Sequence, residues 1–259
     1  NKGLPYAKGE YILLLNNDTI VTKTFLSELV KEIEKDENVG VVQGKLISMD
    51  FRDRLDSVGA FLTNTGFLYH YGYLQKNHKK YDRSIYLYTA KGACMMARST
   101  VIKKVGLFDE EYFAYFEESD FCHRVWLAGY TIRYAPKSVI YHKIGGTTNA
   151  MRNSFIQFHS FKNRINTYIK NLGLLELIQI LPIHILLCEV AAFGFLFLRK
   201  PGHFVAVNKA IIWNITNLSN TLIKRRYVQT KIRKRSDKEI MKFIKKSGSF
   251  KYYYYLFAK

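Results

Sequence analysis

The chain has 259 residues, of which 48% are hydrophobic and 24% charged, which is typical of a globular protein with one large domain or one domain plus an appendage. Its net charge of +19 is unusually high and uneven, because residues 199–259 hold 16 Lys and Arg against only Asp237 and Glu239. This basic tail favours phosphate-bearing partners such as an anionic membrane surface. Nucleic acid is not an expected partner, because no recognition motif accompanies the charge.

An apolar strand is expected at residues 10–15, and it ends abruptly in the polar residues Asn16, Asn17 and Asp18. Such a run, closed by turn-forming residues, is typical of an interior strand in a sheet covered on both faces. Ligands of open α/β sheets lie beyond the carboxyl ends of the strands, so Asp18 stands where a ligand is expected. The same residue types also favour a turn and a helix N-cap, and this stretch alone leaves both interpretations open.

Helices and strands are expected to alternate through the rest of the first half. Apolar spacing predicts a helix at 22–36, a buried strand at 39–47, a long loop region with short strands at 51–90, a strand leading into a short helix at 91–108, a helix at 117–129 and a strand at 131–142. The last strand ends in His142. This alternation predicts an α/β domain over residues 1–150.

Residues 151–259 are predicted to be helical, first apolar and then basic. The stretch 172–198 is long enough to span a membrane, but it contains Pro182, which would kink it, and the polar residues Glu176, Gln179, His184 and Glu189. We therefore expect an interfacial or re-entrant hairpin that holds a peripheral or monotopic protein at the cytoplasmic face of the membrane, with the basic segment 224–235 at the head groups. A helix that spans the membrane, a core helix and a solvated basic helix are the alternatives.

Three carboxylates crowd the start of the helix predicted at 117–129. Glu117, Glu118 and Asp120 lie where the helix dipole tolerates negative charge, and Arg124 can pair with Asp120 one turn later. Clustered carboxylates raise one another's pKa, which suits one of them to act as a general base. The alternative is a capping cluster solvated at a helix end.

Two motifs together resemble glycosyltransferase family 2, whose members are inverting enzymes with a GT-A fold. They are LLLNNDT (13–19) and AKGACMMARSTVIKKVGLFDEEYFAYFEESDFCHRVWLAGYTIRYAPKSVIYH (90–142). Their order and spacing are closest to the rhamnosyltransferase-like branch. The resemblance implies a Rossmann-like α/β domain with a mostly parallel sheet and flanking helices, followed by the helical membrane-associated segment. It also implies that the nucleotide-gripping part of the domain precedes Asn1, so that residues 1–150 form a partial catalytic domain.

The resemblance also implies roles for individual residues. Asp18 would bind Mg²⁺ or Mn²⁺ at the donor diphosphate, with His142 completing the metal site and Asn16 at the first position of the DxD pattern. Glu118 matches the catalytic base, and Glu117 and Asp120 would orient the acceptor and Arg124. The residues expected on the substrate side are Asn17, Gly92, Ala93 and Arg124.

The implied function is transfer of a sugar, with inversion, from a nucleotide-sugar donor to a polyprenyl-linked or cell-surface glycan acceptor. An amide is a weaker metal ligand than a carboxylate, so Asn16 favours one alternative, a catalytically impaired relative that serves as a membrane- or anion-binding module. A processive polysaccharide synthase is disfavoured, because the sequence has no QxxRW motif and no set of clear spanning helices.

Overall fold

The computed structural model describes residues 1–143 and 153–246. The strands and α-helices are β1 (Tyr11–Leu15), β2 (Thr19–Val21), α1 (Phe25–Ile33), β3 (Val39–Ser48), β4 (Leu55–Ser57), β5 (Ala60–Leu62), β6 (Leu68–His70), β7 (Cys94–Arg98), α2 (Ser99–Val105), α3 (Glu117–Leu127), β8 (Thr131–His142), α4 (Asn153–Asn171), α5 (Leu174–Phe197), α6 (Pro201–Thr216), α7 (Leu218–Tyr227) and α8 (Asp237–Ile244). Short 3-10 helices lie at Leu4–Tyr6 and Lys79–Tyr81, and a π-helical segment lies at Val228–Ile232.

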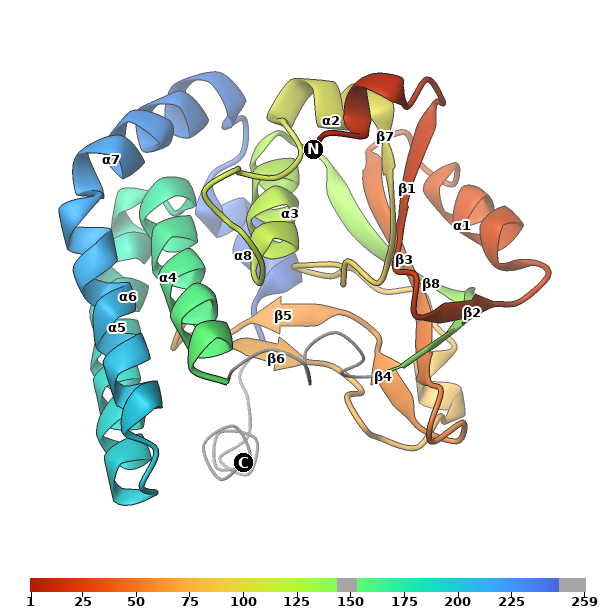
Figure 1. Cartoon of the computed structure of the whole chain (residues 1–259). Helices are drawn as coiled ribbons and strands as arrows, with labels where there is room; N and C mark the ends of the chain where they lie inside the picture. The colour runs from red at the N-terminus through yellow and green to blue at the C-terminus, as the bar shows by residue number, and fades with distance from the viewer. Residues whose placement is uncertain (144–152, 247–259) are drawn as a thin grey trace.

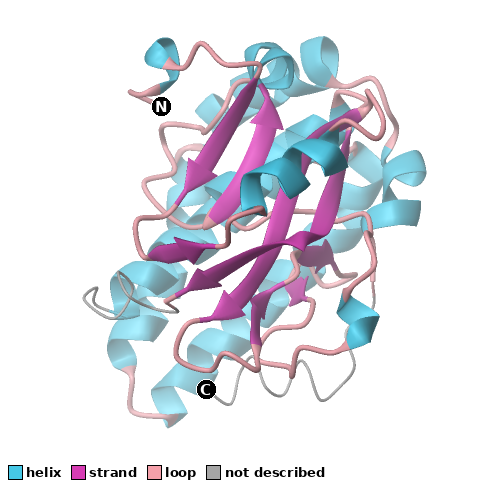
Figure 2. Cartoon of the chain, turned by 90° about the vertical axis from the view of Figure 1, so that its right-hand side faces the viewer, coloured by secondary structure: helices cyan, strands magenta, loops and turns pink. Residues whose placement is uncertain are grey.

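Figure 2 shows the strands of the central sheet with helices around them. The sheet is mixed, with strand order β1-β7-β3-β8-β2 and β4 paired to β3. Among these pairs only β3 and β8 are parallel. The expectation of a mostly parallel sheet was therefore wrong. A parallel pair needs a long crossover, usually helical, and β3 and β8 have one through α2 and α3. Between β3 and β7, however, residues 49–93 form no α-helix, and β7 returns antiparallel to β3.

Helices cover both faces of this sheet (Figure 1). On one face, Leu29 and Ile33 of α1 pack against alternate residues of β3, such as Val42. On the other face, α3 contributes Phe121 and Trp126 to the main core. Helix α3 also contacts α4, so it lies between the sheet and a further layer of helices formed by α4 to α7.

Most predicted elements are present with small changes in their ends. The strand predicted at 131–142 is β8, the helix at 117–129 is α3, and the strand at 39–47 is β3, in which all ten residues are buried. Residues 10–15 do form β1, but this strand lies at the edge of the described sheet and its residues are half-buried or exposed. Within the described residues β1 has one neighbouring strand, so the interior position expected for it stays a prediction.

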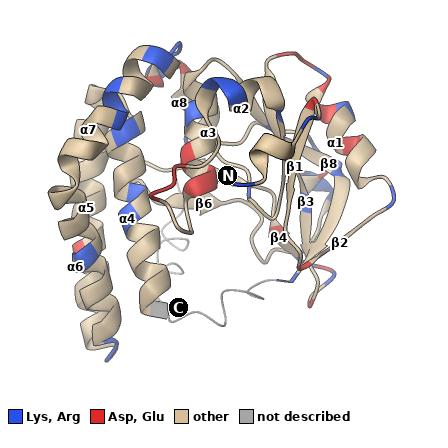
Figure 3. Cartoon of the chain, turned by 45° about the horizontal axis from the view of Figure 1, so that its top comes forward, with Lys and Arg blue, Asp and Glu red and all other residues tan. Residues whose placement is uncertain are grey.

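The apolar stretch 172–198 forms α5, a single 24-residue helix that contains Pro182. Helix α6 packs against α5 after a three-residue turn at 198–200, so the two make a helical hairpin. By length and composition α5 could cross a membrane: an 18-residue stretch of it has a mean hydropathy of 2.1, and 28% of that stretch is buried inside the molecule. Its exposed apolar residues include Leu175, Ile178, Leu186, Val190, Phe193 and Phe197. Figure 3 shows α5 with few charged residues, whereas Lys and Arg gather on α7.

The basic segment 224–235 is partly engaged inside the molecule. Lys224 pairs with Asp109 and Glu111, and the guanidinium of Arg225 donates to two carbonyls at the end of α4. Arg233 pairs with Asp237. The exposed basic residues of the segment are Arg226, Lys231 and Lys234. Only these three are therefore fully presented to a partner.

Candidate active site

The sheet brings Asp18 and His142 together, although 123 residues separate them along the chain. Thr19 of β2 is paired with His142 at the end of β8, which places Asp18 beside the imidazole. His142 Nε2 lies 3.3 Å from Asp18 Oδ1. The other ring nitrogen, Nδ1, is 2.7 Å from Asp56 Oδ2, so one histidine stands between two aspartates.

Asp56 is fully buried in β4 and also binds Lys91. The Lys91 ammonium is 2.8 Å from both carboxylate oxygens. Burial alone would raise the pKa of Asp56, but hydrogen bonds from His142 and Lys91 outweigh it and lower that pKa. Asp56 is therefore held as a carboxylate, which can only accept, so Nδ1 of His142 carries the proton in their hydrogen bond.

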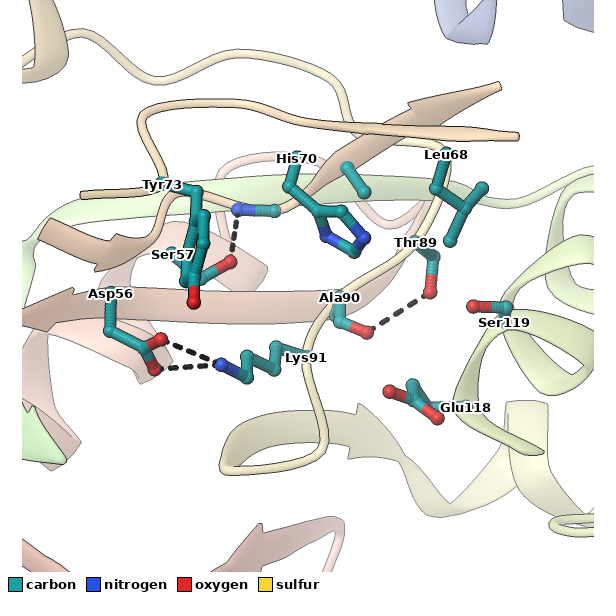
Figure 4. A pocket seen from close by; sticks show the side chains of 12 residues that line it. Asp56, Ser57, Leu68, His70, Tyr73, Thr89, Ala90, Lys91, Glu118 and Ser119 are labelled. Carbon is teal, nitrogen blue, oxygen red and sulfur yellow. Dashed lines mark hydrogen bonds and ion pairs between the residues drawn. The ribbon is translucent and has the colours of Figure 1, made fainter. Parts of the chain in front are cut away.

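Asp56 and Lys91 line one end of a cavity of about 340 Å³, and Glu118 and Ser119 of α3 line the other (Figure 4). The remaining lining residues are Ser57, Gly59, Ala60, Leu68, His70, Tyr73, Thr89 and Ala90. Asp18 and His142 are not in the lining; they lie behind Asp56, on its side of the cavity. A cavity of this size suits a small polar ligand with an anionic part at the Lys91 end.

Glu118 has the perturbed acidity expected of a catalytic carboxylate. Burial, and then the charge of Glu117, raise the pKa of Glu118 to about 8, while the positive charge of Lys91 opposes them. Burial raises the pKa of Glu117 as well. One carboxylate oxygen of each is buried without a hydrogen-bond partner in the part of the chain that the structure describes. Such groups are common in functional sites.

Asp120 and Arg124 lie away from the cavity. Asp120 is fully buried and binds Arg124 at 3.0 Å, Lys170 at 2.9 Å and Asn171 at 2.9 Å. The Arg124 guanidinium also donates to the carbonyls of residues 105–107, at the end of α2 and just after it. The ion pair expected between them is present, but these contacts join α2, α3 and α4 rather than facing the cavity.

The remaining predicted residues lie at the carboxyl end of β1 and just before the start of β7. Asn16 and Asn17 are exposed. The backbone N–H of Asn16 donates to the Ala93 carbonyl at 3.1 Å, which joins the end of β1 to the start of β7. Ala93 is buried. A Cβ placed on Gly92 would meet nothing within 4 Å, so open space adjoins its backbone.

The side chains of this site can be compared with the ligands of a divalent cation. Within residues 1–143 and 153–246, no group of three acidic, histidine or cysteine side chains is arranged as a ligand set. Nevertheless, Asp18 Oδ1 is buried without a hydrogen bond from the described residues and faces a ring nitrogen of His142. The bond between His142 and Asp56 is the carboxylate–histidine contact that orients metal-binding histidines. The donor chemistry therefore fits a cation held by Asp18 and His142.

Asp56 and Lys91, which connect the two predicted halves of the site, were not predicted. Lys91 directly precedes the predicted Gly92 at the start of a predicted strand, and this position could have marked it as a site residue. Asp56 lies in the region predicted as a loop with short strands, and no motif marks it. Only the pairing of Leu46 with Ser57 places it beside His142.

Three comparisons relate the chain to known proteins. The family described as glycosyl transferase family group 2 matches residues 11–223. The low-salt glycan biosynthesis hexosyltransferase Agl10 of Haloferax volcanii is 26% identical over 131 residues, which are 48% of this chain and 40% of that protein. An N-acetylglucosaminyl-diphospho-decaprenol L-rhamnosyltransferase of Mycobacterium tuberculosis is 39% identical over 57 residues, 22% of this chain and 19% of that protein. The matches thus span less than half of either relative.

The solved structure of S. aureus TarS 1–349 in complex with UDP-GlcNAc is similar with a TM-score of 0.52 and 17% identity. The similarity covers 89% of this chain and 66% of that one, and at this identity it shows the fold alone: an α/β fold with a mixed sheet flanked by helices. The family match covers most of the chain. The chain therefore belongs to glycosyl transferase family group 2, a group of glycosyltransferase enzymes.

Proposed function

We propose that the protein to which this chain belongs transfers a sugar, with inversion, from a nucleotide-sugar donor to an acceptor hydroxyl. The observation that carries the proposal is one cavity with a high-pKa carboxylate, Glu118, at one end and the pair of Lys91 and Asp56 at the other, with His142 and Asp18 linked behind Asp56. The first end suits proton removal and the second suits a diphosphate. Inverting sugar transfer needs both functions on opposite sides of the anomeric carbon.

In this mechanism Glu118 removes the proton of the acceptor hydroxyl as that oxygen attacks the anomeric carbon. A base pKa of about 8 places the proton affinity near the working pH, where a general base is effective. The bond from the anomeric carbon to the diphosphate breaks on the opposite face, and the nucleoside diphosphate leaves toward Lys91. Glu117 raises the proton affinity of Glu118, whereas Asp120 and Arg124 hold α3 in place.

The donor end is organised around Asp56. Lys91 offers its ammonium to phosphate oxygens, and the open space beside Gly92 admits the donor sugar close to the backbone. Asp18 and His142 would hold Mg²⁺ or Mn²⁺, and the carboxylate of Asp18 is the ligand type that both ions favour. When bound, such a cation supplies positive charge that stabilises the leaving diphosphate. Asn16 and Asn17 remain candidate contacts at the same edge.

The acceptor is proposed to be a polyprenyl-linked or cell-surface glycan, as in the rhamnosyltransferase-like branch. The exposed apolar face of α5, together with Arg226 and Lys231, would hold the protein peripherally or monotopically at the anionic cytoplasmic surface of a membrane. Each basic residue near such a surface contributes about 1 kcal/mol. Residues 1–150 then supply the chemistry and 151–259 the attachment.

A panel of nucleotide sugars offered to the full-length protein tests the proposal. We expect transfer from at least one donor with Mg²⁺ or Mn²⁺ and none after chelation, with inverted configuration at the anomeric carbon of the product. A retained configuration would contradict the role of Glu118. Failure to transfer from every donor, with vesicle binding intact, would instead support the alternative of a membrane-binding relative without activity.

A further inference from the structure

The loop that carries Glu118 into the cavity has two consecutive residues in the left-handed backbone region. Tyr115 has φ of 66° and Phe116 has φ of 72°, and Glu117 directly after them begins α3. Non-glycine residues rarely adopt this conformation, and they keep it only where surrounding contacts hold it. Some part of the molecule must therefore hold these two residues.

Helix α4 supplies those contacts. The carboxamide nitrogen of Asn163 donates to the Ala114 carbonyl at 2.9 Å and to the Tyr115 carbonyl at 2.6 Å. Asn163 is fully buried, so water does not compete for these hydrogen bonds. The neighbouring Lys162 donates to the Glu111 carbonyl at 2.8 Å, which holds an earlier part of the same loop.

We propose that Asn163 is a positioning residue for catalysis: it holds the left-handed turn at 115–116 and thereby aims Glu118 at the acceptor hydroxyl. The proposal rests on the proposed role of Glu118 as the base. A carboxamide suits this task because its single NH₂ group has two donors, one for each carbonyl. An aspartate of the same shape would present only acceptors to those carbonyls. A site supported by a rigid helix is held more tightly than one on a free loop.

Asn214 on α6 offers a closely matched control. It is also buried, and its carboxamide nitrogen donates to two carbonyls, of Lys162 at 3.1 Å and of Ala210 at 2.8 Å. Like Asn163, it has an Oδ1 without a hydrogen-bond partner among the described residues. Its bonds join α6 to α4 and do not reach the turn. Asn214→Ala therefore removes a similar buried amide without touching residues 114–116.

The experiment compares Asn163→Ala, Asn214→Ala and the double variant Asn163→Ala/Tyr115→Gly in the full-length protein. Two quantities are measured: amide hydrogen exchange of residues 112–120, and kcat and KM for sugar transfer. We expect Asn163→Ala to speed exchange in this segment and to lower kcat by roughly 10- to 100-fold, because a small displacement of a catalytic group costs this much. KM should stay within about twofold of the wild-type value, since binding contacts are unaffected.

The other two variants separate positioning from general destabilisation. Asn214→Ala should leave both exchange at 112–120 and kcat near wild type. Tyr115→Gly in the Asn163→Ala background should recover at least about threefold in kcat, because glycine adopts positive φ without strain. Unchanged exchange in Asn163→Ala, or faster exchange with an unchanged kcat, would overturn the proposal. A wild-type protein without transfer would overturn the proposed function instead, and the exchange data would still decide whether Asn163 holds the turn.

Discussion

Replacing Asp56 by asparagine perturbs the linked set of side chains at its centre. The carboxylate accepts hydrogen bonds from His142 Nδ1 at 2.7 Å and from the Lys91 ammonium at 2.8 Å. An asparagine keeps the shape but has a single acceptor oxygen, so its NH₂ group must face one of these two donors. Hydrogen bonds to a charged group contribute about 1.5 to 3 kcal/mol each. The Lys91 side chain is 36% exposed and can turn to water, so its share is the smaller.

We therefore expect Asp56→Asn to lower the free energy of unfolding by about 1.5 to 3 kcal/mol. For a protein of this size, that corresponds to a fall in Tm of roughly 3 to 12 °C. The effect on metal affinity should be similar in free energy, since a tenfold change in Kd is about 1.4 kcal/mol. A group that orients a metal-binding histidine is typically worth about 10- to 100-fold in affinity, so Kd for Mn²⁺ should rise by that factor.

Mn²⁺ titrations followed by electron paramagnetic resonance, with thermal melts of the same samples, measure both quantities. Asp53→Asn is the control, because Asp53 is exposed and lies three residues away, with the same change of charge. It should leave Kd and Tm near wild type. An Asp56→Asn protein that binds Mn²⁺ as tightly as the wild type would refute the inference that Asp56 orients His142 toward a cation.

Two further predictions concern the base and the membrane. Glu117→Gln should move the acidic limb of the kcat/KM profile to lower pH, and Lys91→Met should move it to higher pH, because Glu117 raises and Lys91 lowers the pKa of Glu118. Shifts of the same sign would contradict these opposing effects. Leu186→Glu on α5 should weaken sedimentation with phosphatidylglycerol vesicles by roughly 10- to 100-fold, as expected for one lost buried leucine. Leu26→Glu on the exposed side of α1 should leave this binding unchanged, and equal binding by the two variants would exclude α5 as the membrane contact.

The sequence predicted the site best where polar residues follow an apolar strand. Asp18 and His142 each lie at the end of a predicted strand, and the pairing of β2 with β8 does bring them together. Glu118 was marked by its acidic neighbours at a helix start, and its raised pKa follows from burial there. In these cases a local pattern fixes the position of the side chain, and sheet geometry supplies the rest.

Residues whose role depends on pairing between distant segments were not predictable in this way. Asp56 is an unremarkable acid in sequence, and it becomes central only because β4 pairs with the end of β3. The mixed direction of the sheet was missed for a related reason: apolar runs such as 94–98 indicate burial without indicating strand direction. Conversely, Asp120 shared the pattern of Glu118 but points to Lys170 and Arg124, because successive helical positions face different neighbours.

The pH dependence of sugar transfer by wild-type and Glu118→Gln protein measures whether Glu118 removes the acceptor proton in this cavity. We expect a wild-type kcat/KM that rises with pH and levels off above about pH 8, because the base must lose its proton to act. We also expect Glu118→Gln to lower kcat by roughly 10²- to 10⁴-fold and to abolish this pH dependence. Transfer by Glu118→Gln at the wild-type rate and with the wild-type pH profile would exclude Glu118 as the base.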